Sequence, residues 1–412
     1  MVVGLAAVGM VAAGMGGVNF GLFIPSMSKD LGISQVFFGW AYSARLIGFS
    51  VTGWYLGRVL DRHGARIPLA VAGALLGCVM AGLAALQAAW QLIALFFLLG
   101  MIGLEGGGGN LYLAVPLSRW FVRKRGKAMS MAALGTTMGI LLYSPLSEYL
   151  IARYGWRAAW LILGLSGSII MILIALWIIR KDPQSMGFGP DGEPLVDRGS
   201  KRSGARWLQT PVEYSWSLKR AIRSRTFWAL VVIHGLRMFS VSTMIVFRIP
   251  FFIQHGVSSR MVAWAISVEA VIASFSSILA GRAVDRFNSR VVVVVALIVF
   301  IATFIVTINF ATTFHVFLAT ALYGISASAY VVAQNSLWPD YFGSLHIGSI
   351  RGFSLLTTLV FSIIGAPLTG AVKDATGSYV PAWIFSLICL MVATVLMWIT
   401  KKPTPNRKDL NP

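Results

Sequence analysis

The chain has 412 residues, of which 57% are hydrophobic and only 12% are charged, and its formal net charge is +20. A soluble globular domain carries about twice that fraction of charged residues, so this class of protein is excluded. The apolar runs are each near the roughly 20 residues that a helix needs to cross a bilayer, and they lack the alternating pattern of a transmembrane β-barrel. The composition therefore predicts an all-α protein that crosses a membrane many times.

In chain order, the apolar runs predict twelve membrane spans. They lie near residues 2–26, 35–57, 67–88, 91–117, 127–152, 157–179, 226–253, 261–282, 290–309, 315–338, 348–372 and 379–400. Between the sixth and seventh spans, residues 180–225 are polar and rich in proline, glycine and basic residues, as is typical of a linker. The predicted organisation is an N-terminal six-helix bundle (1–179), this linker (180–225), a C-terminal six-helix bundle (226–400) and a tail (401–412).

Basic residues are distributed unevenly around these spans. With both termini on one side, the segments on that side hold 26 lysines and arginines, whereas the loops on the other side hold 5. Since basic loops remain in the cytoplasm, we expect both termini and the linker to be cytoplasmic, in a prokaryotic inner membrane. The positive charge then reflects topology and attraction to anionic membrane lipid, and no nucleic-acid partner is expected.

The two predicted bundles resemble each other in sequence. GRVLDRHGAR at 57–66 returns as GRAVDRFNSR at 281–290, with five of ten positions identical and an offset of 224 residues. The preceding loops also match, as LGISQVFFGW at 31–40 and HGVSSRMVAW at 255–264. Parallel repeats of six spans are typical of secondary transporters.

The segment 57–66 resembles the loop signature of the major facilitator superfamily, G-x-x-x-D-R-x-G-x-R, and it lies between the second and third spans as in that family. The resemblance covers essentially the whole chain. It implies two six-helix bundles that rock about a central cavity. It also implies that Asp61 and Arg62, with Asp285 and Arg286 in the second copy, gate the cytoplasmic side. A carboxylate is favoured near a helix N-terminus, so Asp61 is expected to face the start of the eleventh span near Ile347.

Two further stretches are similar to one branch of this superfamily. WFVRKRGKAMSMAALGTTMG at 120–139 and GMGGVNFGLFIPSMSKDLGIS at 14–34 resemble the monocarboxylate porters and the related oxalate–formate antiporters. The chain departs from this branch at the expected anion-binding positions. The porters' Asp and Arg in the eighth span correspond to Ala273 and Ser277, and residues 352–372 contain no counterpart of the antiporters' lysine. The resemblance therefore supports a small organic anion without identifying the residue that binds it.

Ionisable residues inside the predicted spans are candidates for that role, because burying them in a membrane is costly. Arg237 lies about eleven residues, or roughly 16 Å, into the seventh span, and it shares one helical face with His234 and Arg248. A guanidinium group binds a carboxylate through paired N–H donors, so we expect Arg237 and Arg248 to bind substrate. The alternatives remain open that Arg237 joins two helices, that Arg248 reaches the membrane surface and that His234 only packs.

Charged residues in the other spans suggest coupling and gating. Arg45 and Glu269 are counterparts in the repeat, at equal depth, and we expect them to form a gating pair or a static one. Glu105, inside the fourth span, has no charged neighbour in its own helix. A lone buried carboxylate tends to be protonated, so Glu105 and Glu269 are the candidates for proton coupling. Glu148 is expected at the membrane surface.

Uncharged polar residues occur at matching levels of the fourth and tenth spans. Asn110 and Tyr112 lie in the fourth, and Gln334 and Asn335 lie in the tenth. In the family's pattern both spans line the cavity, so these side chains are expected to contact substrate. Because buried polar groups also need partners, bonding between helices is an equal alternative.

Together these features predict a secondary active transporter that works by alternating access and carries a small, monocarboxylate-like anion with a proton. A proton-coupled efflux carrier for amphipathic compounds is the alternative, and a membrane sensor that transports nothing is a more distant one. An enzyme is not expected, because the five histidines are scattered without catalytic or metal-binding spacing. We expect a monomer with no cofactor and no metal.

Overall fold

The computed structural model describes the chain except for residues 16, 105–110, 122–124, 180–215, 344 and 404–412. Within the described residues, every regular element is an α-helix. The first half contains α1 (Val2–Gly14), α2 (Gly17–Leu31), α3 (Gln35–His63), α4 (Arg66–Ala84), α5 (Ala89–Met101), α6 (Leu111–Trp120) and α7 (Arg125–Trp177). The second half contains α8 (Leu218–Arg223), α9 (Arg225–Gln254), α10 (Ser259–Arg286), α11 (Ser289–Ile308), α12 (Thr313–Phe342), α13 (Ile347–Thr376) and α14 (Val380–Ile399).

These helices correspond to the predicted spans, with three differences. The first span is divided into α1 and α2, and the fourth is represented by α5 and α6. The fifth and sixth spans are recorded together as α7, which turns at Gly155, where φ is 80°. Residues with a side chain rarely adopt such a positive φ, so glycine suits this turn. Within the predicted linker, residues 218–223 form the short helix α8.

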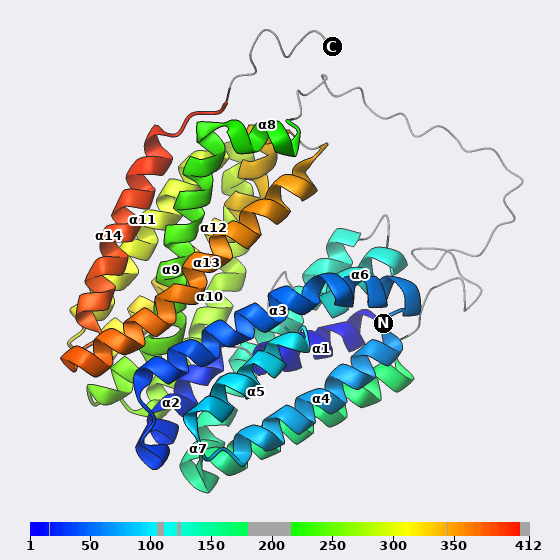
Figure 1. Cartoon of the computed structure of the whole chain (residues 1–412), viewed down its shortest axis with the longest axis vertical. Coiled ribbons are helices and arrows are strands. Elements are labelled where there is room, and N and C mark those ends of the chain that lie inside the picture. Colours follow the sequence, from blue (N-terminus) through cyan, green and yellow to red (C-terminus); the bar gives the residue numbers. More distant parts are fainter. Residues whose placement is uncertain (16, 105–110, 122–124, 180–215, 344, 404–412) are drawn as a thin grey trace, which may run out of the picture.

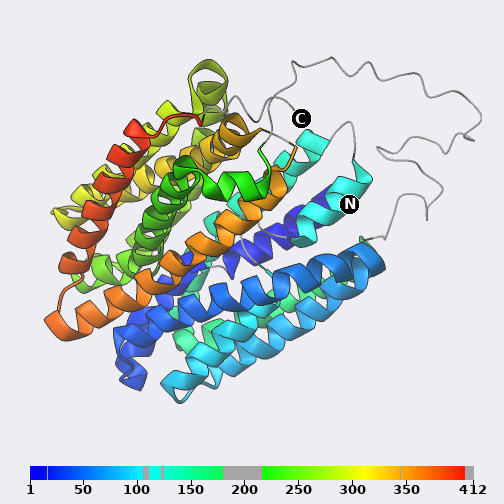
Figure 2. The ribbon, with the colours of Figure 1, turned by 45° about the horizontal axis from the view of Figure 1, so that its top comes forward.

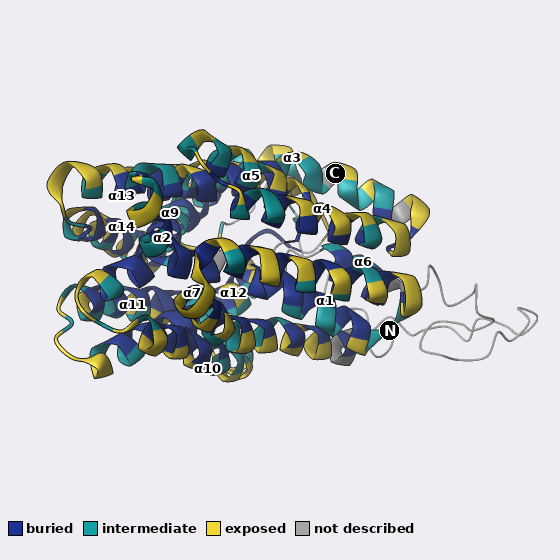
Figure 3. Ribbon diagram, turned by 90° about the horizontal axis from the view of Figure 1, so that it is seen from below, coloured by how far each residue is buried: buried dark blue, intermediate teal, exposed yellow. Residues whose placement is uncertain are grey.

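The chain is built as two helical bundles, α1–α7 and α9–α14 (Figure 1). In the described residues, nine helical segments are long and apolar enough to cross a membrane, if α1 and α2 are taken together as one; α7 is another. Large apolar side chains remain exposed on their outward faces, whereas the inward faces are buried (Figure 3). Apolar side chains on the outward faces suit helices surrounded by lipid. The backbone polar groups of such helices are satisfied within each helix.

The two bundles meet at one end of the molecule. We call the end at which the chain leaves α7 and enters α8 the linker end, and the opposite one the far end. At the far end α3 crosses α13 so closely that a methyl group on Gly39 would lie 2.6 Å from backbone atoms of Ala366 and Pro367. Farther along α3, a methyl group on Gly53 would meet nothing within 4 Å. The two helices diverge toward the linker end (Figures 1 and 2).

Candidate functional site

The strongest concentration of buried charge lies between α9 and α12 in the second bundle. Two arginines of α9 face two tyrosines of α12: Arg237 Cζ lies 3.9 Å from the ring centre of Tyr330, and Arg248 Cζ lies 4.2 Å from that of Tyr323. The arginines are only 3% and 2% exposed, and both tyrosines are buried. A guanidinium group over an aromatic face is attracted to it, and more strongly when water is excluded. We call these residues, with Glu269, His234 and Gln334, the α9–α12 cluster.

The spacing along the two helices explains this arrangement. Arg237 and Arg248 are eleven residues apart on α9, which is about three turns, so they lie on one face. Tyr323 and Tyr330 are seven residues apart on α12, about two turns. The later arginine faces the earlier tyrosine, so α9 and α12 run in opposite directions. Ser224 caps the start of α9, because its Oγ accepts a hydrogen bond from Phe227 N at 3.1 Å.

Arg248 has a carboxylate partner. Its Nη2 lies 2.6 Å from Oε2 of Glu269 on α10, and both residues are buried. The two atoms are at ion-pair distance but are not aligned as a hydrogen bond. Within the described part of the chain, no nitrogen of the Arg248 guanidinium has a hydrogen-bond partner. The charge of Arg248 is therefore balanced while its donors remain available to another acceptor.

Arg237 differs from Arg248 because no described carboxylate forms an ion pair with it. Its Nε has no hydrogen-bond partner among the described residues, and its other aromatic neighbour, Phe300, lies 5.8 Å from Cζ. Polar groups lie close by: His234 Nδ1 is 3.3 Å from Tyr330 Oη, and His234 Nε2 is 3.3 Å from Gln334 Nε2. A buried charge is costly unless it is paired, so this site favours an anion.

Several residues expected to bind substrate or a proton lie together in this cluster. Arg237, Arg248, Glu269 and Gln334 are all members, whereas Asn335 is exposed on another face of α12. Two residues that the sequence analysis did not single out, Tyr323 and Tyr330, complete the cluster. Their spacing of two turns places both on one face of α12, but it marks them as partners of the arginines only once α9 is known to lie opposite.

The expected pair of Arg45 and Glu269 is wrong as a direct contact, because Glu269 faces Arg248. Arg45 is 2% exposed and donates to the carbonyl oxygens of Met15 at 3.4 Å and Leu104 at 3.3 Å. These carbonyls lie just after the ends of α1 and α5, where a helix leaves its acceptors without partners. The alternative that Arg248 reaches the membrane surface is also wrong, because its ion pair keeps it inside the bundle.

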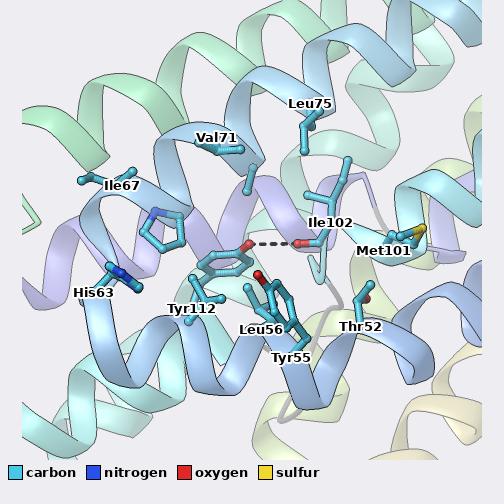
Figure 4. Close-up of a pocket in the computed structure, with 13 residues that line it drawn as sticks. Thr52, Tyr55, Leu56, His63, Ile67, Val71, Leu75, Met101, Ile102 and Tyr112 are labelled. Carbon is cyan, nitrogen blue, oxygen red and sulfur yellow. Dashed lines mark hydrogen bonds between the residues drawn. The ribbon is translucent and has the colours of Figure 1, made fainter.

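Tyr112 is not part of the α9–α12 cluster. It is buried in the first bundle, and its hydroxyl donates to the carbonyl oxygen of Ile102 at 3.0 Å. Figure 4 shows this contact beside a pocket of about 440 Å³ between α3 and α4, into which Tyr55 and His63 also face. Glu105 and Asn110, predicted to couple protons and bind substrate, lie outside the described residues.

The predicted gating residues lie toward the linker end, where α3 and α13 diverge. Arg62, Asp285 and Arg286 are exposed there, and Asp61 lies in the last turns of α3, with its side chain outside the described part. Glu148 is only 9% exposed and accepts a hydrogen bond from Ser259 Oγ at 2.8 Å. It therefore lies between the bundles at the far end, and its expected depth at the membrane surface stays a prediction.

Comparison with known proteins is decisive for the family. The family model of the Major Facilitator Superfamily matches residues 6–257 and 238–412. This chain belongs to that superfamily. It is therefore a membrane transporter, and the two bundles are the two halves of the superfamily fold.

Curated relatives and solved structures agree with this assignment. Monocarboxylate transporter 12 of Rattus norvegicus is 24% identical over 352 residues, which cover 80% of this chain and 71% of that protein. A putative tartrate transporter of Agrobacterium vitis is 24% identical over 408 residues, covering 94% and 90%. A nucleoside transporter structure has a TM-score of 0.76 at 12% identity, covering 97% of this chain and 100% of its own. A bacterial homolog to the human lysosomal transporter Spinster has a TM-score of 0.70 at 14% identity, covering 98% of both chains.

Proposed function

We propose that this superfamily member is a secondary active transporter of a small organic anion, whose carboxylate binds to Arg237. The observation that carries the proposal is the guanidinium of Arg237, which is buried and stacked on Tyr330 without a carboxylate partner among the described residues. A carboxylate could bind it through two parallel charge-assisted hydrogen bonds. The anion would then supply the negative charge that this buried site lacks.

The balance of charge in the cluster suggests the valence of the substrate. Arg237 and Arg248 contribute two positive charges, and Glu269 contributes one negative charge when ionised. While Glu269 is ionised, one bound carboxylate brings this sum to zero, which suits an anion of low charge. The names of the relatives, a monocarboxylate transporter and a tartrate transporter, support an organic acid. An excess of cations in the cluster argues against the alternative of a cationic amphipathic substrate.

Glu269 is the residue through which we propose that a proton is coupled. Its protonation would leave Arg248 without a counter-charge and make the cluster more positive. A proton on Glu269 would therefore increase the affinity for an anion, and a bound anion would increase the affinity for the proton by the same factor. This reciprocal coupling is what a symporter of protons and anions requires. Glu105 remains a second candidate for the proton.

The arrangement of the halves fits one state of alternating access. The bundles contact each other at the far end and diverge toward the linker end. With the termini in the cytoplasm, as the distribution of basic residues favours, this state faces the cytoplasm. Transport would require the far end to open while the linker end closes, with Asp61, Arg62, Asp285 and Arg286 contributing to the closed linker end.

Uptake into proteoliposomes tests the proposal. We expect the purified protein to accumulate labelled L-lactate or L-tartrate, and to do so faster under an inwardly directed proton gradient. Arg237→Met should abolish saturable uptake. Arg237→Lys should retain a fraction, because an ammonium group keeps the charge but lacks the planar pair of donors.

Two results would contradict parts of this proposal. Uptake by Arg237→Met at the wild-type rate would exclude Arg237 as the anion site. Glu269→Gln should bind anions yet lose acceleration by the proton gradient; a gradient response equal to wild type would remove Glu269 from the coupling step. A thermal-shift screen with mono- and dicarboxylates checks that each variant is folded and reports binding without transport.

A further inference from the structure

Two of the seams along which the halves touch at the far end are related to each other by the repeat; in addition, α2 packs against α9, where a methyl group on Gly21 would lie 2.8 Å from Ile249. In the α3–α13 seam, the end of α13 lies against the start of α3. In the α7–α10 seam, the middle of α7 lies against the start of α10. Gln35 and Ser259, the first residues of α3 and α10, are counterparts at the repeat offset of 224. In each seam, a carboxylate from the other half bonds to this first residue.

In the α3–α13 seam the carboxylate bonds to the backbone. Asp374 accepts hydrogen bonds from Gln35 N and Val36 N, both at 2.9 Å. These are the first two N–H groups of α3, which have no acceptor within their own helix. The positive end of the helix dipole also favours a carboxylate there. Asp374 of the second half therefore caps a helix of the first half.

The residue that would ordinarily cap α3 is present but unused. Ser34 occupies the N-cap position with an extended backbone, φ −69° and ψ 155°, yet its side chain makes no capping hydrogen bond. A capping serine accepts from the second or third N–H group of the helix. The second N–H belongs to Val36, which already donates to Asp374, and the third, from Phe37, donates to the backbone oxygen of Ser34. Ser34 and Asp374 are thus competing acceptors for one helix end.

The α7–α10 seam lacks this competition. The α10 helix is capped by its own Ser258, whose Oγ accepts from Met261 N at 3.3 Å. Glu148 reaches only the side-chain hydroxyl of Ser259, at 2.8 Å. The proline repeat, Pro145 and Pro367, places Asp374 opposite Ala152, which has no carboxylate. Among the described residues of these two seams, only Asp374 therefore accepts from the backbone N–H groups that begin a helix of the other half.

We propose that Asp374 and Ser34 form an exchangeable cap that sets the balance between the closed and the open far end. When the far end is closed, Asp374 caps α3 across the seam. When α13 moves away, the N–H of Val36 is released and the Ser34 hydroxyl replaces the carboxylate. The N–H of Val36 then has an acceptor in both states, and each acceptor stabilises only one of them.

The labelling rate of a buried cysteine in the seam tests this device. Ser43 of α3 is fully buried, and its hydroxyl donates to Ile363 O at 2.6 Å across the seam. A Ser43→Cys reporter, in a background with Cys78→Ser and Cys389→Ser, should react with N-ethylmaleimide only when the far end opens. Its rate follows the open population even when that population is small. No substrate is added, so the result does not depend on the proposed function.

The two members of the cap should act in opposite directions. A side-chain cap usually changes a folding equilibrium by roughly 2- to 30-fold. Asp374→Ala should accelerate labelling within that range, because it removes the acceptor of the closed state. Ser34→Ala should slow labelling within the same range, because it removes the acceptor of the open state. Asp374→Asn should accelerate it less than Asp374→Ala, because an amide oxygen still accepts but carries no charge.

Glu148→Ala provides the matched control in the other seam, and it should change the rate less than twofold. Unchanged labelling in Asp374→Ala would overturn the proposal, and so would faster labelling in Ser34→Ala. An effect of Glu148→Ala as large as that of Asp374→Ala would show that any loosening of the far end exposes the reporter. The milder Asp374→Asn variant decides the outcome if Asp374→Ala does not elute as a single species in size exclusion.

Discussion

Buried arginines serve different purposes in the two bundles. In the first, Arg45 donates to the carbonyl oxygens of Met15 and Leu104, beyond the ends of two helices. In the second, Arg237 and Arg248 lie over tyrosine rings with donors that no described residue accepts. Arg45 therefore supports the chain just after α1 and α5, whereas several donors of the second bundle's arginines have no acceptor among the described residues.

The repeat shows that this difference arose on one scaffold. Counting back 224 residues from Arg237 and Arg248 gives Ala13 and Ile24, which are buried and apolar. Counting back from Glu269 gives Arg45 itself. Equivalent backbone positions thus hold opposite charges or none. The two halves are similar in backbone, but the buried charges of the α9–α12 cluster, Arg237, Arg248 and Glu269, all belong to the second half.

Among the substitutions that test this comparison between the bundles, the largest loss of stability is expected at Glu269. Glu269→Ala leaves the buried charge of Arg248 without its partner, and breaking a buried ion pair in this way usually costs about 3–5 kcal/mol. Thermal unfolding in detergent should therefore begin at a clearly lower temperature. The double variant Arg248→Met with Glu269→Ala should recover most of the loss, because no buried charge then lacks a partner. If the double variant were less stable than the single one, the ion pair would not be the cause.

A somewhat smaller loss of stability is expected at Arg45. Arg45→Ala leaves two buried carbonyls unsatisfied, and an unsatisfied buried group costs roughly 1–3 kcal/mol. Arg45→Lys should retain part of the stability, because an ammonium group has donors but reaches the two carbonyls less well. Arg237→Met is the matched control from the other bundle. It should change the unfolding temperature less than Arg45→Ala does, while it abolishes anion binding. The reverse pattern would break the comparison between the bundles.

Much of the fold was predictable because lipid imposes simple requirements on sequence. Apolar runs of membrane length gave the spans, and the repeat of 57–66 at 281–290 gave the two halves. The ends of α1 at Gly14 and of α5 at Met101, inside the predicted first and fourth spans, were not predicted, because hydropathy averages over a window and does not detect where a helix ends. Closure at the far end was not predictable either. The sequence of a transporter must allow both the closed and the open state, so it does not indicate which of the two a structure will show.

The charged members of the α9–α12 cluster were predicted individually, but their pairings were not. Arg237, Arg248 and Glu269 were identifiable because an ionisable residue in a membrane span is costly and seldom kept without a use. The prediction that Arg45 pairs with Glu269 was wrong, because equal depth in the membrane does not say which helix a side chain faces. The two tyrosines were hidden among many aromatic residues, since a ring is recognised as a cation partner only once the opposite helix is known. The α3–α13 seam was missed because Asp374 bonds to backbone N–H groups, which leave no mark in the sequence.

The smallest effect concerns the aromatic support of the two arginines. A cation over an aromatic ring is worth about 0.5–2 kcal/mol, so Tyr330→Leu should weaken anion binding at Arg237 by roughly 2- to 30-fold. Tyr330→Phe keeps the ring and loses only the contact between Oη and His234, so it should bind nearly as tightly as wild type. Tyr323→Leu should change anion affinity less than Tyr330→Leu, because the guanidinium that it supports is already balanced by Glu269. Dissociation constants from titration of the purified variants would rank them. Equal losses in the two leucine variants would mean that both arginines contact the anion, and the site would then extend along α9 from Arg237 to Arg248.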